Sequence, residues 1–268
     1  MPDTAATINL TRQPFEKAIA FLREKTAIPS TEWDQIWAEA QDYCFSITGI
    51  TRADILADIQ EAIAQALENG TPLSQFKKDF QAIVTNKGWI PPEGLDTPWR
   101  LALIFNQNIR GAYAAGRSEQ LDDPDILAAR QYRMYRHRDS RHPRPAHLAL
   151  DGKVFLAQDP VWATIMPTNG FGCRCAVFAL SDRDLERRGL SVSEPPKGTV
   201  LIKDRQTGKT MRVPSINGQP IAEPGFTYNP GRGLKEQRAA VIQDAIDRLP
   251  PNLQAKAKDS IGGNNRKA

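Results

Sequence analysis

The stretch DSRHPRPAHLALDGKVFLAQDPVWATIMPTNGFGCRC, residues 139–175, combines many turn-forming residues with most of the chain's histidines and cysteines. His142 and His147 lie within it, Cys173 and Cys175 end it, and His137 precedes it by two positions. The dipeptides Asp-Gly at 151–152 and Asp-Pro at 159–160 are turn signals. We therefore expect short strands joined by tight turns here, with the histidines and cysteines brought near one another.

Histidine and cysteine together are the side chains that zinc prefers, and zinc usually takes four of them at about 2.0–2.3 Å. His147, Cys173 and Cys175 supply three candidate ligands, and His142 or His137 is available as a fourth. The C-x-C spacing is less typical of zinc than C-x-x-C, so two alternatives stay open. The cysteines are either structural without a metal, or one of them is a catalytic thiol paired with a histidine.

A basic segment overlaps this cluster. Residues 130–147 contain six arginines, three histidines, no lysine and a single acid, Asp139. The planar guanidinium binds phosphate or carboxylate through paired hydrogen bonds. The candidates for contact with nucleic acid or an acidic partner are Arg133, Arg136, Arg138 and Arg141. The alternative is that these arginines pair with the N-terminal half, because residues 1–120 carry 11 basic and 15 acidic side chains.

Composition excludes several classes of protein. The chain has 268 residues, 40% apolar and 25% charged, which is typical of a soluble protein able to bury its own core. Three cysteines are too few for a disulfide scaffold, so a reducing compartment is expected. No apolar run approaches the ~20 residues of a membrane-spanning helix. The opening MPDTAATINL lacks the basic and apolar regions of a secretory signal.

The first 120 residues favour helices, because apolar residues recur there every three or four positions. A T-x-x-D pattern at Thr51 and Asp54 resembles a capping box. Gly70 is a helix stop, and Thr97-Pro98 is a helix start. Four of the expected helices cover 14–25, 55–67, 73–88 and 97–121. A further short helix is expected after 14–25; Thr31 caps it, and it holds Trp33 to Trp37. The polar string Asn106, Gln107, Asn108 and Arg110 is either a solvated face or a polar contact surface.

Beyond residue 121 the pattern favours strands. The expected strands are 131–138, 154–156, 175–180 and a hairpin over 198–213 that turns at Gln206-Thr207-Gly208. Asp151, Gly152, Trp162, Gly170 and Gly172 are expected to shape the turns around the two cysteines. A last helix is expected over 234–249, and the polar tail IGGNNRKA, residues 261–268, is expected to be disordered. The prediction is an α+β fold with three parts: a helical domain over 1–121, a smaller mixed domain over 122–233, and a C-terminal helix and tail over 234–268.

Common enzyme motifs are missing. The sequence has no HExxH, no GxSxG, no GxxxxGK[ST], and no GxGxxG after a strand. These motifs therefore assign no catalytic residue.

The motifs of residues 139–175 resemble those of a known family. D-x-R followed by H-x-x-L-D-G, then D-P-x-W and P-x-N-G-x-G-C-R-C, is similar to the signature of phage Mu F-like head-morphogenesis proteins, also called minor capsid proteins. The segments FEKAIAFLREK, DILADIQEAIAQALENGTPLSQFKKDF and WRLALIFNQNIRGAYAAGRSEQL look like the helical N-terminal region of that family, and SDRDLERRGL and YNPG fit it downstream. The resemblance covers most of residues 14–233.

The resemblance implies a minor head protein of a phage or prophage that acts in procapsid assembly near the portal vertex. The implied partners are the portal and other head or scaffold proteins, with DNA as a further contact and no membrane. The implied location is the host bacterial cytoplasm during assembly and then the virion head. The alternative function is a zinc-dependent hydrolase or nuclease acting during head maturation.

The resemblance also bears on the metal. Other branches of the family carry C-x-x-C before the L-D-G motif, and its two cysteines align with Arg144 and His147 here. Arginine is not a zinc ligand, so the resemblance implies three retained ligands, His147, Cys173 and Cys175, and one lost. His142 is then a weaker candidate for the fourth, and His137 and His142 are expected to belong to the arginine-rich segment.

Overall fold

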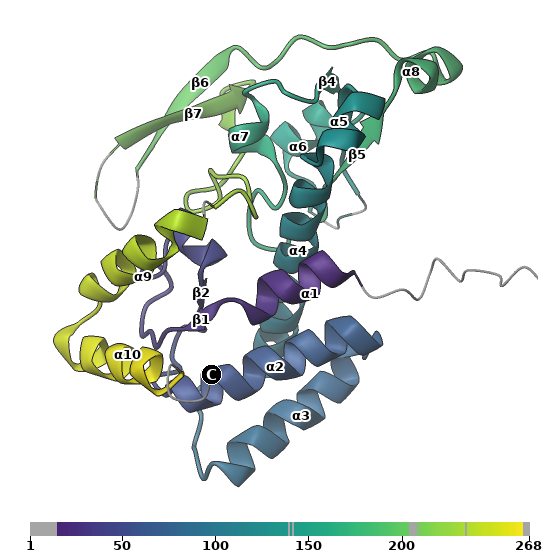
Figure 1. Cartoon of the computed structure of the whole chain (residues 1–268). Helices are drawn as coiled ribbons and strands as arrows, with labels where there is room; N and C mark the ends of the chain where they lie inside the picture. The colour runs from purple at the N-terminus through teal and green to yellow at the C-terminus, as the bar shows by residue number, and fades with distance from the viewer. Residues whose placement is uncertain are drawn as a thin grey trace, which may run out of the picture.

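The computed structural model describes residues 15–138, 140, 142–203, 208, 210–233 and 235–264. The fold is α+β with a helical N-terminal part, which confirms the predicted class. In Figure 1 the helices of the N-terminal part lie below, and the small sheets lie above.

The N-terminal part is built from helices α1 (Glu16–Arg23), α2 (Ala53–Asn69), α3 (Leu73–Asn86) and α4 (Pro98–Leu121), which share one apolar core. The predicted stripe of α2 is confirmed, because Ile55, Ile59, Ile63 and Leu67 are all buried. The helix ends where Gly70 adopts a positive φ of 66°, a conformation that glycine takes without steric cost.

Helix α4 links the two parts of the molecule. Its start is the one that the sequence predicts: the Thr97 hydroxyl accepts a hydrogen bond from the backbone N–H of Arg100, and Pro98 is the first helical residue. Its 24 residues correspond to a length of about 36 Å. Figure 1 shows α4 running from the helical part up to the sheets, so one helix contributes side chains to both.

Two local predictions in the N-terminal part are wrong. Residues 31–37 are not helical, because the Gln35 side chain accepts hydrogen bonds from the backbone N–H groups of Thr31 and Glu32 and fixes a turn. Thr51 does not cap α2 either, since Arg52 holds the cap position and forms an ion pair with Asp54. A short 3₁₀ turn, η1 (Ala38–Asp42), and a parallel pair, β1 (Thr26–Ala27) and β2 (Cys44–Phe45), occupy the region instead.

The C-terminal part contains an antiparallel sheet with the order β4-β3-β5, formed by Val154–Leu156, Tyr132–Arg136 and Ala176–Leu180. These strands match the predicted ones closely. Four short helices surround the sheet: α5 (Pro124–Ala129), α6 (Pro145–Leu150), α7 (Trp162–Ile165) and α8 (Asp182–Arg188). Trp162 is fully buried, packs edge-on against Phe155, and donates its indole N–H to the Leu156 carbonyl.

The predicted hairpin is confirmed as β6 (Gly198–Lys203) paired antiparallel with β7 (Thr210–Ile216), and β8 (Gln219–Pro220) adds a short third strand. Figure 1 shows this ribbon projecting from the rest of the molecule. Two residues of the predicted turn, Gln206 and Thr207, lie outside the described residues.

The C-terminal segment differs in part from its prediction. A 3₁₀ turn, η2 (Lys235–Gln237), precedes α9 (Arg238–Asp247), which confirms the predicted helix, and a second helix, α10 (Pro251–Asn264), follows it. The first four residues of the predicted disordered tail, 261–264, belong to α10, and residues 265–268 lie outside the described residues. The break falls at the prolines 250–251, and proline is favoured at the first position of a new helix. α9 and α10 cover an apolar cluster contributed by the N-terminal part, which includes Ile28, Tyr43 and Cys44. The predicted domain limits stay a prediction.

Candidate functional site

The nitrogen and sulfur atoms of two histidines and two cysteines converge at one end of the β4-β3-β5 sheet. The Sγ atom of Cys175 lies 3.5 Å from Nδ1 of His137 and 3.5 Å from Nδ1 of His147. The Sγ atom of Cys173 lies 3.9 Å from the same His147 nitrogen. The ligand atoms of His137, His147 and Cys175 all lie within 4.8 Å of one another. We refer to these four residues as the His/Cys cluster.

His147 is held in one orientation by its second nitrogen. It lies on α6 and is only 2% exposed. Its Nε2 lies 2.8 Å from the carbonyl oxygen of Ile221, which can only accept, so Nε2 carries the proton. The lone pair of Nδ1 therefore faces the two sulfurs. Metal-bound histidines are commonly oriented in this way, with the other ring N–H donated to a carbonyl or carboxylate.

His137 enters the cluster through strand pairing. Arg136, the last residue of β3, pairs with Ala176, the first residue of β5, so the residues just beyond them, His137 and Cys175, are neighbours. The Asp151 carboxylate accepts the backbone N–H of His137 at 2.9 Å and forms an ion pair with Arg136 at 3.2 Å. The aspartate of the L-D-G motif therefore fixes the end of β3 from which His137 projects.

Hydrogen bonds and an ion pair hold the loop before Cys173 in place. Gly172 has a φ of 71°, and its N–H donates to the Gln107 side chain at 3.1 Å. The Arg144 guanidinium pairs with Glu223 at 2.6 Å and donates to the Phe171 carbonyl at 2.9 Å. Where the resemblance places a cysteine in other branches, this chain thus has an arginine that anchors the loop by an ion pair.

Asn169 adds a buried polar contact beneath the cluster. Its side-chain amide donates to the Tyr135 hydroxyl at 3.1 Å and to the Ile165 carbonyl at 2.9 Å. The asparagine of P-x-N-G-x-G-C-R-C therefore joins the loop to strand β3, where sequence reasoning assigned it no role.

The two thiols share a proton unequally. The pKa of Cys173 is lowered, chiefly by a hydrogen bond from Cys175 and against the effect of burial, with a further hydrogen bond from the backbone N–H of Asn169. The pKa of Cys175 is raised, because its proton is held by Cys173 and because the side chain is buried. A cation bound between the sulfurs takes the place of that proton, as thiolate ligands require.

The cluster fits zinc by donor type, and its compact part, His137, His147 and Cys175, also fits by spacing, whereas Cys173 lies near His147 but outside that compact group. Four ligands at about 2.0–2.3 Å from a tetrahedral ion lie roughly 3.5 Å apart, and the measured separations of 3.5, 3.5 and 3.9 Å are close to this value. The donor set is two imidazoles and two thiols, a combination common in structural zinc sites.

The structure brings together the three predicted ligands, His147, Cys173 and Cys175, and adds a fourth. That fourth residue is His137, which the resemblance had assigned to the arginine-rich segment. His142, the weaker candidate, is exposed and does not belong to the cluster found among the described residues. The available signal for His137 was its place near the end of the predicted strand 131–138, although the register that sets it beside Cys175 is a tertiary feature.

The predicted contact arginines lie in different environments. Arg133 is fully buried, and its Nη2 donates to the Leu121 carbonyl and to Asp122 at 2.6 Å, so it presents no charge to a partner. Arg136 pairs with Asp151, and Arg138 is exposed and lines a pocket described below. Arg141 lies outside the described residues.

None of the helices in the described ranges combines the length and apolar content needed to cross a bilayer.

Comparison with known proteins identifies the relatives of this chain. Residues 57–178 match the model of a family described as Phage Mu protein F like protein. The chain is similar to the putative capsid assembly protein F of Escherichia phage Mu, with 30% identity over 93% of this chain and 62% of that protein. It is also similar to the Mu-like prophage FluMu F protein of Haemophilus influenzae, with 31% identity over 79% of this chain and 55% of that protein.

The chain thus spans about three fifths of the length of these two curated relatives. No solved structure matches it. The match to the family model includes α4, the predicted zinc ligands and the start of β5, so the motifs that suggested the family lie largely inside the matched region. These matches confirm the resemblance of the chain to the phage Mu F-like family.

Proposed function

We propose that this chain is a minor head protein of a phage or prophage that takes part in procapsid assembly at the portal vertex, with the portal and scaffold proteins as partners and DNA as a further contact. The observation that carries the proposal is the similarity, over 93% of the chain, to a phage Mu protein named as a putative capsid assembly protein. The proposed location is the host cytoplasm during assembly and the virion head afterwards.

The helical part offers an apolar surface to a protein partner. Ile90 is 88% exposed and Trp99 is 70% exposed, and both lie in or beside the segment that joins α3 to α4. Large exposed apolar side chains, tryptophan above all, are enriched where proteins bind one another. The segment between α3 and α4 is therefore the part of the chain that we assign to docking on the portal.

A structural zinc ion in the His/Cys cluster is part of this proposal. His137, His147, Cys173 and Cys175 would hold it, and it would supply a cross-link between the end of β3, helix α6 and the loop before β5. Such sites contribute directly to folding because the ligands come together only in the folded chain.

The alternative, a zinc-dependent hydrolase or nuclease, requires a different occupancy of the cluster. A catalytic zinc keeps three protein ligands and one open position. A donor set of two histidines and two cysteines in one region is typical of structural zinc sites, and this favours the structural role. The Cys173→Ala variant distinguishes the two roles. If the zinc is structural, the variant loses a ligand and the protein becomes less stable. If the zinc is catalytic and held by the other three residues, the protein keeps its fold and an enzymatic activity changes.

Co-expression with the portal protein of the same phage or prophage tests the head-assembly role. We expect a stable complex on size-exclusion chromatography, and we expect Ile90→Ser with Trp99→Ser to abolish it. Val192→Ser, another exposed apolar residue on a different part of the surface, is the matched control and leaves the complex intact. Absence of a complex with the unsubstituted chain contradicts the proposal.

A further inference from the structure

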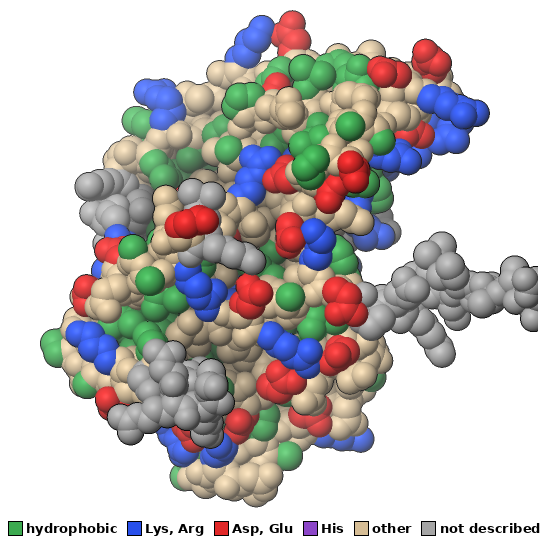
Figure 2. Space-filling view, viewed as in Figure 1, with side chains coloured by type: hydrophobic (Ala, Val, Ile, Leu, Met, Phe, Trp, Pro, Cys, Tyr) green, Lys and Arg blue, Asp and Glu red, His purple; other side chains and the backbone are tan. Residues whose placement is uncertain are grey.

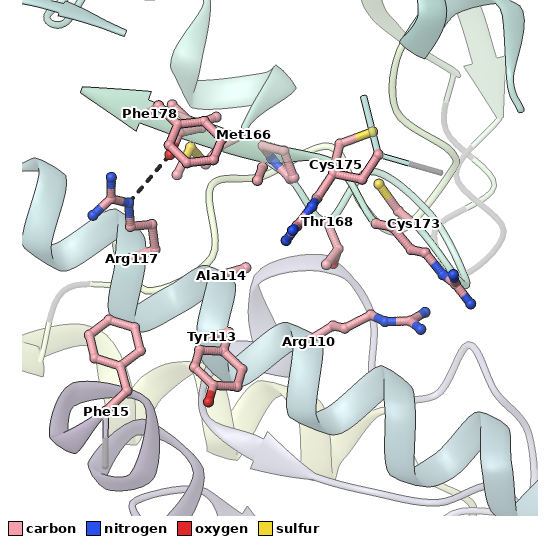
Figure 3. A pocket seen from close by; sticks show the side chains of 15 residues that line it. Phe15, Arg110, Tyr113, Ala114, Arg117, Met166, Thr168, Cys173, Cys175 and Phe178 are labelled. Carbon is pink, nitrogen blue, oxygen red and sulfur yellow. Dashed lines mark hydrogen bonds between the residues drawn. The ribbon is translucent and has the colours of Figure 1, made fainter. Parts of the chain in front are cut away.

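A pocket of about 800 Å³ lies beside the His/Cys cluster, between helix α4 and the start of β5. Figure 3 shows Arg110, Tyr113 and Arg117 of α4 on one side of it and Cys173, Cys175 and Phe178 on the other. It is lined by four arginines: Arg110, Arg117, Arg138 and Arg174. None of its described lining residues is acidic.

The positive charge of this pocket differs from the rest of the visible surface. Over α1 and α2, Figure 2 shows basic and acidic side chains intermixed, and those arginines and lysines form ion pairs such as Lys17 with Glu119 and Arg23 with Glu61. In the pocket, by contrast, Arg117 binds uncharged groups, the Val177 carbonyl at 3.3 Å and the Gln120 side chain at 2.6 Å. No carboxylate of the described lining therefore competes with a polyanion for these arginines.

The arginines also act on one another. The pKa of Arg110 is lowered by partial burial first and by the charge of Arg174 second. The pKa of Arg117 is lowered by partial burial and by Arg133 and Arg130. A bound anion relieves this repulsion, and the gain is largest for a ligand that carries several negative charges.

Aromatic rings accompany the arginines. Tyr113 and Phe178, which line the pocket from α4 and from β5, are 45% and 43% exposed. Phe15, also in the lining, stacks on Tyr113 with 5.7 Å between the ring centroids and supports that ring from behind. Exposed rings beside a basic groove are the features with which proteins bind single-stranded nucleic acid, because unpaired bases stack on the rings while cations contact the phosphates.

We propose that this pocket binds a phosphodiester strand with unpaired bases, its phosphates on Arg110, Arg117, Arg138 and Arg174 and a base on Tyr113 or Phe178. The concave shape favours a single strand over a duplex, whose stacked bases are not free to enter. The inference deepens the DNA contact of the proposed function by assigning it to a site. That site shares Arg138 with the basic segment predicted from sequence, and its other three arginines come from outside that segment.

Fluorescence anisotropy of the full chain with labelled oligothymidylate and oligouridylate of about twelve nucleotides tests the proposal. We expect binding that weakens between about 50 and 200 mM salt, and the two oligonucleotides decide between DNA and RNA. Arg110→Gln and Arg138→Gln should each reduce the dependence of log affinity on log salt by about 0.7. Arg188→Gln removes the charge of an exposed arginine on α8, outside the pocket, and should leave that dependence unchanged.

Tyr113 provides a second, independent measurement. Tyr113→Ala should lower the affinity by roughly tenfold or more without changing the salt dependence, because stacking is lost and no phosphate contact is. Tyr113→Phe keeps the ring and should bind like the unsubstituted chain.

Three outcomes overturn the proposal: no binding to either single strand at low salt, equal losses in Arg110→Gln and Arg188→Gln, or tighter binding of a polyglutamate peptide than of the oligonucleotides. The last outcome assigns the pocket to an acidic protein segment instead. The Arg110→Gln variant also tests this site separately from the head-assembly role. It should bind nucleic acid more weakly but should still form the complex with the portal protein.

Discussion

The Nε2–H of His147 donates to the carbonyl oxygen of Ile221 at 2.8 Å. This bond joins helix α6 to the segment that follows β8, and it leaves only Nδ1 to face the cysteines. A residue far along the chain therefore selects which nitrogen of His147 is available to a metal. The local geometry of the cluster depends on the C-terminal part of the chain as well as on residues 139–175.

The first prediction concerns zinc. The chain purified under reducing conditions should contain about one zinc ion, held by four ligands. His137→Asn and Cys175→Ser should each reduce the zinc content measured by mass spectrometry and lower the melting temperature. His142→Asn, which changes the histidine outside the cluster, should retain both values. Full zinc content in His137→Asn contradicts the assignment of the fourth ligand.

The second prediction concerns the buried Arg133. Burial alone would raise the pKa of Asp122, but hydrogen bonds from Arg232 and Arg133 lower it. Asp122→Asn removes the only acidic partner of Arg133 that the described residues show. The loss should be about 3 kcal/mol in the free energy of unfolding measured with urea, because a buried charge is left uncompensated. Asp54→Asn, in an exposed ion pair with Arg52, should cost less than about 1 kcal/mol; equal losses would refute the explanation.

The third prediction concerns the glycine of the YNPG motif. Gly231 has a φ of 82°, and a Cβ at that position would lie 2.6 Å from the Ala115 carbonyl oxygen of α4. Gly231→Ala should therefore cost about 3 kcal/mol in the free energy of unfolding, from backbone strain and steric overlap together.

Gly189 is the matched control, since it has a φ of 61° and open space around the added methyl group. Gly189→Ala should cost only about 1–2 kcal/mol. If both substitutions lower the free energy of unfolding equally, the requirement for glycine at 231 does not come from close packing of the YNPG segment on α4.

The fourth prediction is a pH dependence. Burial raises the pKa of Asp42 to about 6 from 3.8, although Lys25 and the backbone N–H groups of Gly231 and Gly233 act in the opposite direction. A carboxyl with a raised pKa in the folded state stabilises that state most below its unfolded pKa, and this contribution is lost as the pH rises through about 6.

The free energy of unfolding of the unsubstituted chain, relative to Asp42→Asn, should therefore increase as the pH falls from about 6 to about 4. The increase should be at most about 3 kcal/mol. Asparagine keeps the acceptor for the Gly231 N–H, at 2.9 Å in the structure, without titrating. A difference that stays flat across this range, or that reverses in sign, contradicts the role of Asp42.

Local sequence signals were sufficient to predict the helices and strands whose ends and faces depend on nearby residues alone. The stripe of α2 and its stop at Gly70, the Thr97-Pro98 start of α4, and strands β3, β4 and β5 follow from side-chain period and from backbone preferences of single residues. The predictions were wrong where a competing side-chain contact or a tertiary contact determines the structure. The Gln35 side chain replaces a helix with a turn, and burial of Arg133 against Asp122 is invisible in a charge count.

The candidate site divides in the same way. His147, Cys173 and Cys175 could be identified from the sequence, because histidine and cysteine are metal donors by residue type and these three lie in the motif segment. His137 depends on the register of β3 against β5. The arginine pocket depends on α4, which places Arg110 and Arg117 opposite a loop more than fifty positions away in sequence. Neither relationship is encoded in the local pattern.

The packing of α9 and α10 on residues 28–44 has a consequence for synthesis on the ribosome. Ile28, Tyr43 and Cys44 emerge early, but the side chains that cover them, such as Ile246 and Leu253, are translated only near residue 250. Until then residues 28–44 carry an uncovered apolar face. A nascent or truncated chain is thus distinguishable from a finished one by that face, and chaperones that bind apolar surface have a target that completion of the chain removes.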